Sequence, residues 1–367
     1  MQRKKRGKKN MWVRPENEKL QYSGRIDHSS KSAPVFVYPC TSVRVRFSGD
    51  GIKVWLRNRH QYWDNYMGYI ADGKQGKFRL EEDTTPDERT EGCLICGLAY
   101  EIPLDPQRDV HDLLLFKRQD SCHEVTFLGF EIENGVEVLE LPPKPQRRIE
   151  VYGDSVSAGE VSEAVEYTGK PDPEHNGQFS NCWYSYAWMT ARKLNAQIHD
   201  VAQGGIALLD GTGWFNGPDY VGMETAWDKI HYNPAFGPAT VWDFKGYIPQ
   251  VVIVAIGQND SHPEDYMKED HHCGRALRWR RSYKALLEKI RGQYPDAWIV
   301  CITTLLEHDP AWDQSIDEVC RGMQDEKVRH FLFARNGRGT PGHLRVSEAE
   351  EMSEELTAYI ESLGIDW

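Results

Sequence analysis

The sequence lacks any long hydrophobic run. The basic residues at its start are not followed by an apolar stretch, because Met11-Trp12-Val13 is broken at once by Arg14-Pro15-Glu16. A secretory leader needs an apolar core behind its basic residues, and a membrane helix needs about 20 apolar residues in a row. We therefore expect neither a leader nor a membrane span, no membrane partner, and a cytoplasmic location.

Positive charge is also scarce, since 44 Lys and Arg face 56 Asp and Glu and the formal net charge is -12. An acidic body repels the phosphate backbone, so we expect no nucleic-acid partner. Residues 1–10 are the exception, with six basic side chains and no acidic one. Our hypothesis is that this tip binds an acidic patch, either on its own chain or on a neighbouring subunit of a homo-oligomer.

Cysteine is sparse and poorly spaced for metal binding. Of eight cysteines, Cys93 and Cys96 form the one C-x-x-C pair, and no second pair follows at zinc spacing. This favours packing over metal or redox chemistry, and reduced thiols suit the cytoplasm. His271-His272-Cys273 invites a zinc interpretation, but adjacent side chains rarely face one ion. We expect no metal and no other cofactor.

What the chain does contain is enough for two folded domains: 367 residues with 12 Trp, 17 Tyr and 12 Phe. From about residue 20 to 140, apolar residues alternate with polar ones, and Gly and Asp turns separate short runs. Residues 43–47 and 52–56, joined by Ser48-Gly49-Asp50-Gly51, are typical of a β-hairpin. The pattern predicts a β-sandwich of the jelly-roll type over residues 1–145, ending in the Pro-rich linker 141–147.

Aromatic residues of this first domain could bind sugar rings. Tyr62, Trp63 and Tyr66 are the candidates, and the alternative is that they fill the core or the junction between the domains. Many short strands at a chain terminus are also found in carbohydrate-binding modules, so a carbohydrate-interacting domain stays open at this point.

From residue 146 the pattern becomes alternating strand and helix. Strands are predicted near 149–152, 197–202, 249–256, 298–305 and 328–333, and helices near 184–194, 277–293, 314–326 and over the last 20 or so residues. Residues 160–180 are a polar loop. This alternation predicts an α/β domain over 146–367, with a doubly wound parallel sheet of the flavodoxin-like kind.

Polar residues that suit acyl transfer follow four of these strands. Gly153-Asp154-Ser155 places a serine at a strand end, and Gly205, Asn259 and His343 lie beyond later strands. The carboxyl ends of parallel strands meet at one edge, so the four residues should converge there. Ser155 would attack an ester, His343 would move its proton, and Gly205 and Asn259 would hold the oxyanion.

These motifs resemble the SGNH, or GDSL, hydrolases, whose blocks supply Ser, Gly, Asn and His in this order. Gly153-Asp154-Ser155-Val156-Ser157 and Gly257-Gln258-Asn259-Asp260 carry the resemblance, and Gly205 matches more loosely. With Tyr22-Ser23-Gly24-Arg25-Ile26-Asp27 and Ala33-Pro34-Val35-Phe36 in front, the chain is similar to carbohydrate esterase family 2. The resemblance implies a metal-free acetyl xylan esterase that deacetylates sugar hydroxyls of polysaccharides such as xylan.

The chain departs from the family pattern beside the histidine. Where related enzymes carry Asp three or two residues before it, this sequence has Thr340 and Pro341. A carboxylate normally orients the imidazole. We therefore expect a Ser–His dyad in which a backbone carbonyl orients His343, with a triad completed by a distant carboxylate as the alternative.

The substrate should bind on the loops around this edge. Trp312 is the first candidate for a platform under a sugar ring and Trp214 the second; the alternative for Trp312 is a packed loop aromatic. Two other functions stay open: a short-chain aryl or lipid esterase with the same site, and a non-catalytic glycan-binding protein.

Overall fold

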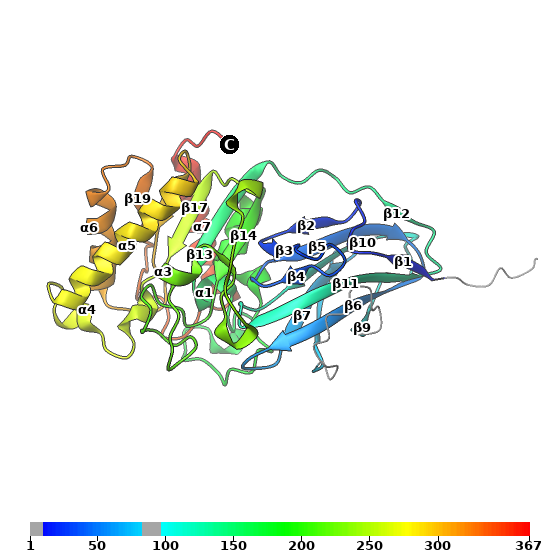
Figure 1. Ribbon diagram of the computed structural model, residues 1–367, viewed down its shortest axis with the longest axis horizontal. Helices are drawn as coiled ribbons and strands as arrows, with labels where there is room; N and C mark the ends of the chain where they lie inside the picture. The colour runs from blue at the N-terminus through cyan, green and yellow to red at the C-terminus, as the bar shows by residue number, and fades with distance from the viewer. Residues whose placement is uncertain (1–9, 83–96) are drawn as a thin grey trace, which may run out of the picture.

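The first domain is built of antiparallel strands. The computed structural model describes residues 10–82 and 97–367, so the basic tip and the Cys93–Cys96 pair lie outside the described residues. Figure 1 shows this domain beside the α/β domain along the long axis of the molecule. Its strands are β1 (Met11–Val13), β2 (Gln21–Ser23), β3 (Ile26–Asp27), β4 (Val35–Phe36), β5 (Ser42–Ser48), β6 (Gly51–His60), β7 (Tyr66–Ala71), β8 (Lys74–Arg79), β9 (Leu98–Ile102), β10 (Val110–Lys117), β11 (His123–Glu133) and β12 (Glu137–Leu139).

These strands form two antiparallel sheets. One has the order β3-β4-β11-β6-β9 with β1 on β11, and the other has the order β12-β5-β10-β7-β8 with β2 on β5. Side chains from both sheets, including Val45, Val54, Leu113 and Phe130, share one buried cluster. Alternate residues of each strand supply this cluster, which is why the sequence shows a period of two. The finer description as a jelly roll stays a prediction.

The predicted hairpin of residues 43–56 is wrong. Strands β5 and β6 follow each other directly, but β5 pairs with β10, β12 and β2, whereas β6 pairs with β11 and β9. The turn therefore carries the chain from one sheet to the other. Val43, Val45 and Phe47 of β5 and Ile52, Val54 and Leu56 of β6 are all buried because they face the same core from opposite sides.

The second domain has a five-stranded parallel sheet of order β14-β13-β17-β18-β19. This is the 2-1-3-4-5 order of flavodoxin-like sheets, as predicted. The elements are β13 (Arg147–Gly153), α1 (Ser155–Ala158), α2 (Tyr186–Lys193), β14 (Ala196–Ala202), α3 (Met223–Ala226), β15 (Lys229–His231), β16 (Thr240–Val241), β17 (Val251–Ala255), α4 (Tyr266–Glu269), α5 (Gly274–Gln293), β18 (Trp298–Cys301), α6 (Pro310–Gly322), β19 (Val328–His330) and α7 (Val346–Ser362), with single 3-10 turns between some of them.

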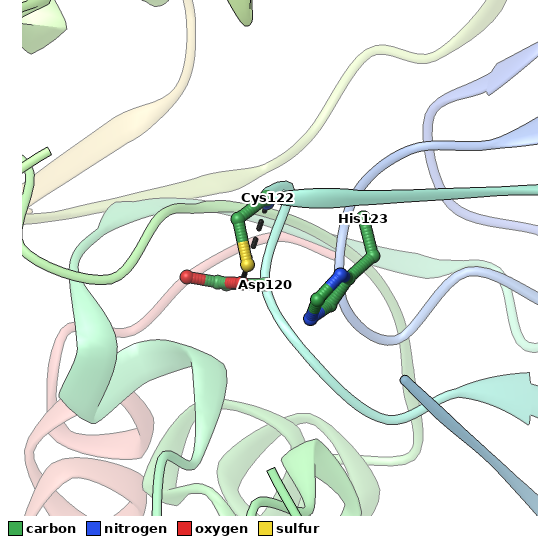
Figure 2. Close-up of side chains that lie close together, drawn as sticks. All are labelled: Asp120, Cys122 and His123. Atoms are coloured by element: carbon green, nitrogen blue, oxygen red, sulfur yellow. Dashed lines mark hydrogen bonds between the residues drawn. The ribbon is translucent and has the colours of Figure 1, made fainter. Parts of the chain in front are cut away.

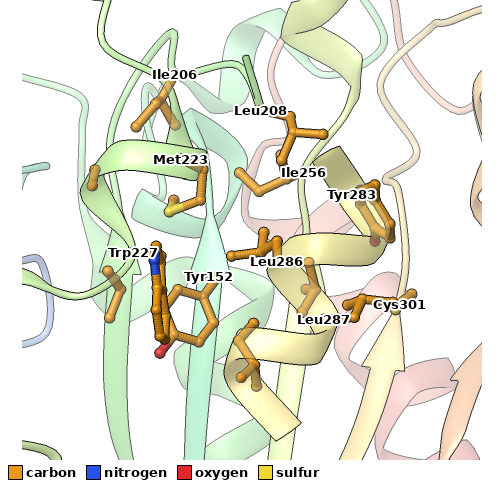
Figure 3. Close-up of a cluster of buried hydrophobic side chains, with 14 of the residues drawn as sticks. Tyr152, Ile206, Leu208, Met223, Trp227, Ile256, Tyr283, Leu286, Leu287 and Cys301 are labelled. Carbon is orange, nitrogen blue, oxygen red and sulfur yellow. The ribbon is translucent and has the colours of Figure 1, made fainter. Parts of the chain in front are cut away.

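Helices cover both faces of this sheet. Val252 and Val254 of β17 belong to the cluster that contains α5 and α6, whereas Val251 and Ile253 belong to the cluster that contains α2 and α7. Both faces of the strand are therefore buried, which explains its unbroken apolar sequence. Figure 3 shows Tyr283, Leu286 and Leu287 of α5 pointing from the helix toward the strands.

A buried arginine joins the two domains. Arg25, between β2 and β3, donates to Glu150 at 2.9 Å and to Tyr152 at 2.8 Å, and both partners lie on β13. Arg25 and Glu150 are fully buried. Burial would raise the pKa of Glu150, but the charge of Arg25 and hydrogen bonds outweigh it and lower the pKa to about 2. A paired charge thus ties the sandwich to β13 of the parallel sheet.

Two further features concern the chain as a whole. None of the helices in the described ranges is long and apolar enough to cross a membrane. The six cysteines in those ranges are free thiols.

Candidate active site

Ser155 stands just beyond the carboxyl end of β13, the second strand of the parallel sheet. Strand β13 ends at Gly153, and α1 begins at Ser155 with Asp154 as its N-cap, whose carboxylate accepts from the N–H of Val156 at 3.0 Å. An aspartate at this position satisfies one of the free N–H groups of the first helical turn. The strand and the capped turn together hold the serine at the edge of the sheet.

The carboxylates of two aspartates link neighbouring strand ends. Asp154 also accepts from Gln258 at 2.9 Å and from Asn259 at 3.1 Å, and it is fully buried, which raises its pKa to about 6. Asp260 accepts from the N–H groups of Leu208 at 2.7 Å and Leu209 at 3.2 Å. The turn after β17 is therefore bonded to the turns after β13 and β14. The amide nitrogen of Asn259 keeps a second N–H for another acceptor.

Gly205 lies in the turn after β14 in a left-handed conformation, with φ of 71°. A Cβ atom there would come within 2.7 Å of the Trp214 side chain, so the position requires glycine. The N–H of Gly204 before it is bonded to Asp120 at 2.6 Å, and that of Ile206 after it to Gln203. In the described part of the chain, no hydrogen bond uses the N–H of Gly205.

His343 meets Ser155, as the sequence predicts. The distance between Nε2 of His343 and Oγ of Ser155 is 2.7 Å. Burial would lower the pKa of His343, but the hydrogen bond to Asp172 and the charges of Glu160 and Asp172 outweigh it and raise this pKa above 6.5. The imidazole is placed to accept the serine proton.

A carboxylate, rather than a backbone carbonyl, orients His343, so the expected dyad is wrong. Nδ1 of His343 lies 2.5 Å from Oδ2 of Asp172, and the backbone N–H of His343 donates to Oδ1 at 2.9 Å. Asp172 reaches this close because residue 342 is glycine: a Cβ there would lie 2.6 Å from Oδ1. The acid thus comes from the loop after Ser155, 171 positions before His343 in the sequence.

Sequence reasoning missed three further residues around this acid. Buried Arg345 donates to Asp172 at 2.8 Å. His175 lies between Asp172, at 3.2 Å, and Glu160, at 2.7 Å. The signal was the loop itself, because about 20 polar residues without regular structure directly after a nucleophile are uncommon unless they are functional. Among them, Glu160, Asp172 and His175 are the titratable residues that the structure gathers at His343.

The two tryptophan candidates lie in different environments. Trp312, on α6, is 0% exposed, and its indole N–H donates to Asp265 at 3.0 Å. It packs in the cluster with Trp279, so its prediction as a sugar platform is wrong and the packed alternative holds. Trp214 is 62% exposed and stacks on His262 with ring centroids 3.4 Å apart. The backbone N–H of Trp214 donates to the carbonyl of Gly205, so Trp214 adjoins the site.

The sandwich domain reaches the site through the loop between β6 and β7, with Tyr62 and Trp63, and through the loop between β10 and β11, with Asp120. Trp63 contacts His175 with ring centroids 5.7 Å apart, and the hydroxyl of Tyr62 accepts from the N–H of Asn216. These aromatic residues therefore lie at the junction of the domains. A pocket beside them is lined by Trp63, Gln119, Asp120, Ala158, Glu160 and Ser180.

Two groups of side chains have ligand atoms close enough to share an ion among the described residues: Asp120, Cys122 and His123 (Figure 2), and Asp172, His175 and His343. In the first, Asp120 already accepts from Cys122, Gln203 and Gly204, and the buried ammonium of Lys117 lies beside it. In the second, each histidine is bonded to Asp172. His271, from the His271-His272-Cys273 run where the sequence did not favour a zinc site, contacts Glu318. We assign no ion to any of them.

Comparison with known proteins identifies the family of the chain. A family model described as carbohydrate esterase 2 N-terminal matches residues 22–142. The chain is 27% identical over 358 residues to the cellulase/esterase CelE of Acetivibrio thermocellus, covering 95% of this chain and 40% of that protein. It is 33% identical over 266 residues to the acetylxylan esterase / glucomannan deacetylase of Cellvibrio japonicus, covering 71% of this chain and 69% of that protein.

Solved structures match nearly the whole chain. A family two carbohydrate esterase from Clostridium thermocellum, solved with cellohexaose, has a TM-score of 0.75 at 26% identity and covers 94% of this chain and 99% of that one. A family two carbohydrate esterase from Cellvibrio japonicus has a TM-score of 0.77 at 22% identity, covering 97% and 98%. With the fold, the convergent strand ends and a relative at 33% identity in agreement, the chain belongs to carbohydrate esterase family 2.

Proposed function

We propose that this chain is a serine esterase that removes O-acetyl groups from xylan, xylo-oligosaccharides and related sugars. The observation that carries the proposal is the contact of Ser155 Oγ with His343 Nε2 at 2.7 Å, with Asp172 on the other imidazole nitrogen. The names of the relatives support the substrate class, because they include an acetylxylan esterase.

The reaction proceeds in two halves. In the first, His343 takes the Ser155 proton as the serine oxygen attacks the acetyl carbonyl, and the tetrahedral intermediate collapses when His343 protonates the departing sugar oxygen. In the second, His343 takes a proton from water, the water oxygen attacks the acetyl-serine, and acetate leaves as Ser155 regains its proton. No cofactor enters either half.

The oxyanion of each intermediate needs donors placed in advance. The N–H groups of Ser155 and Gly205 and the second amide N–H of Asn259 are the groups we assign to it. Asp154 holds Asn259, and the left-handed turn holds Gly205. Each such donor contributes about 3 kcal/mol to transition-state stabilisation in other enzymes of this kind.

Trp214 is the residue we assign to the sugar ring. It is exposed, it adjoins Gly205, and its stack on His262 fixes its plane. A sugar on this indole would place an acetylated hydroxyl near Ser155. A short-chain aryl or lipid esterase would need no such platform, and rates that fall steeply as the acyl chain lengthens past acetyl would separate the two functions.

The test is release of acetate from acetylated xylan and from an acetylated chromogenic ester by the wild type and by Ser155→Ala. We expect loss of activity in the variant on both substrates. Equal rates would refute the esterase, and xylan binding by an inactive wild type would instead favour a glycan-binding protein.

The pH dependence follows from His343, which must be neutral to accept the serine proton. Because its pKa is raised above 6.5, kcat/KM should already fall at pH values near 6.5 and continue to fall below them. A pH profile of kcat/KM checks this, and an acid limb well below pH 6 would contradict it.

A further inference from the structure

Two acids and two histidines form a closed ring next to Ser155: Asp172, His175, Glu160 and His343. His343 Nδ1 lies 2.5 Å from Asp172, and Asp172 lies 3.2 Å from Nε2 of His175. Nδ1 of His175 lies 2.7 Å from Glu160, whose other oxygen is 3.9 Å from Nε2 of His343. Acid and imidazole alternate around the ring, so each imidazole lies between two carboxylates.

The two carboxylates approach His343 from opposite sides. Asp172 binds the Nδ1 side, whereas Glu160 lies near Nε2, the nitrogen that contacts Ser155 Oγ at 2.7 Å. When His343 takes the serine proton, its positive charge therefore lies between two anions. An opposite charge at about 4 Å stabilises such a cation, since the interaction is only partly screened by water at a site this buried.

The second imidazole is a fixed cation. Hydrogen bonds to Asp172 and Glu160 raise the pKa of His175 to about 10, so it is protonated throughout the working range. Burial would raise the pKa of Glu160, but the bond to His175 and the charge of His343 outweigh it and hold this pKa below its usual value. At neutral pH the ring thus holds two anions, one permanent cation and one imidazole that changes charge.

We propose that Glu160 and His175 are opposed positioning residues for the catalytic histidine. Glu160 stabilises protonated His343 from the nucleophile side, while His175 holds both carboxylates in place and limits how strongly they attract the proton. The proposal rests on the function proposed above. It assigns a role to the loop after the nucleophile that goes beyond supplying Asp172.

Other charged groups face the same histidine, and they stay constant in the test. Arg345 donates to the carbonyl of His343 and to Asp172, and the buried carboxylate of Asp154 lies under Ser155 and interacts with the His343 charge. Asp120, from the loop before β11 in the sandwich, repels Glu160. Substitutions at Glu160 and His175 therefore change one charge each against this background.

The experiment compares Glu160→Gln and His175→Gln with the wild type in pH profiles of kcat/KM on an acetylated chromogenic ester. Loss of the Glu160 charge should lower the pKa of the acid limb by about one unit. Loss of the His175 charge should raise it by a similar amount. A residue that served only to hold the loop would reduce the rate without moving the two profiles in opposite directions.

A matched control lies at the junction of the domains. His231 bridges two acids in the same way, with Glu124 at 2.7 Å and Asp27 at 3.1 Å, but none of these residues belongs to the ring. His231→Gln removes an equivalent cation, and we expect the acid limb of its profile to stay at the wild-type position.

Direct titration of His343 separates this proposal from the proposed function. The imidazole signal of selectively labelled His343, assigned by its absence in His343→Ala, reports the same pKa by NMR without turnover. Opposite shifts in the two variants support the proposal even if no esterase activity is found. If the pKa of His343 is the same in both variants as in the wild type, or shifts in the same direction in both, the proposal is overturned. If His175→Gln does not fold, an unchanged His343 pKa in Glu160→Gln is sufficient to overturn it.

Discussion

At the scale of single residues, tryptophan has different roles at positions 214 and 312. Trp312 is 0% exposed and Trp214 is 62% exposed. Both follow strands of the parallel sheet, so their positions in the chain do not separate them. The difference arises because Trp312 lies in the first turn of α6 and packs under it, whereas Trp214 lies on a loop, and these placements depend on contacts distant along the chain.

Trp214→Ala should weaken binding of the acetylated sugar. If the stacking contact contributes about 1.4 kcal/mol of binding free energy, its loss corresponds to a roughly tenfold rise in KM for an acetylated xylo-oligosaccharide. A small aryl acetate, which lacks the ring, should show little change. Steady-state kinetics on both substrates checks this, and an unchanged KM for the oligosaccharide would remove Trp214 from the site.

Asp172→Asn should lower kcat by about 10³ to 10⁴, because an amide in place of the carboxylate favours the wrong tautomer of His343. The matched control is Glu174→Gln, an exposed acid in the same loop, which should retain wild-type kcat. Kinetics on the chromogenic ester measures both. A dyad oriented by a backbone carbonyl predicts that both variants keep their activity, and that result would contradict the triad.

Helix α6 shows what a single buried side chain does for an element. Trp312 packs against Trp279 of α5 and Tyr266 of α4, so it holds three helices together on one face of the sheet. Trp312→Ala should therefore reduce the free energy of unfolding by about 3 to 5 kcal/mol. Trp214→Ala, as the exposed control, should change it by less than about 1 kcal/mol. Urea denaturation measures both, and equal losses would contradict the packing.

The parallel sheet was predictable at this scale because its signals are local. The apolar run of β17 reports burial on both faces, and the Gly153-Asp154-Ser155 turn reports a strand end. The pairing of β5 was not predictable, since a period of two identifies the buried face of a strand but not its partner. Asp172 was missed for a similar reason: its partnership with His343 spans 171 positions and depends on a loop without a regular pattern.

At the scale of the whole molecule, the two domains share buried apolar side chains and are also joined by specific polar contacts. Asp120 of the sandwich accepts from the N–H of Gly204, directly before Gly205, which we propose as an oxyanion donor. Arg25 reaches the strand that carries Ser155. The sandwich therefore supports the geometry of the site, whether or not it binds carbohydrate itself.

Arg25→Met should reduce the free energy of unfolding by about 3 to 5 kcal/mol, because it leaves the Glu150 charge buried without its partner. Adding Glu150→Gln should restore part of this loss. The control is Arg44→Met, whose ion pair with Asp112 is partly exposed and should contribute no more than about 1 kcal/mol. Urea unfolding followed by tryptophan fluorescence measures all three, and equal effects of the two arginines would contradict the role of the buried pair.

The central claim is that acetyl groups pass through Ser155. The most direct test is to mix the enzyme with an acetylated ester, quench within the first turnover, and locate the added acetyl group by mass spectrometry of the digested protein. Our account predicts one acetyl group on the peptide that contains Ser155 and none there in Ser155→Ala. Turnover with an acetyl group on a different residue, or an identical burst in the variant, would contradict it.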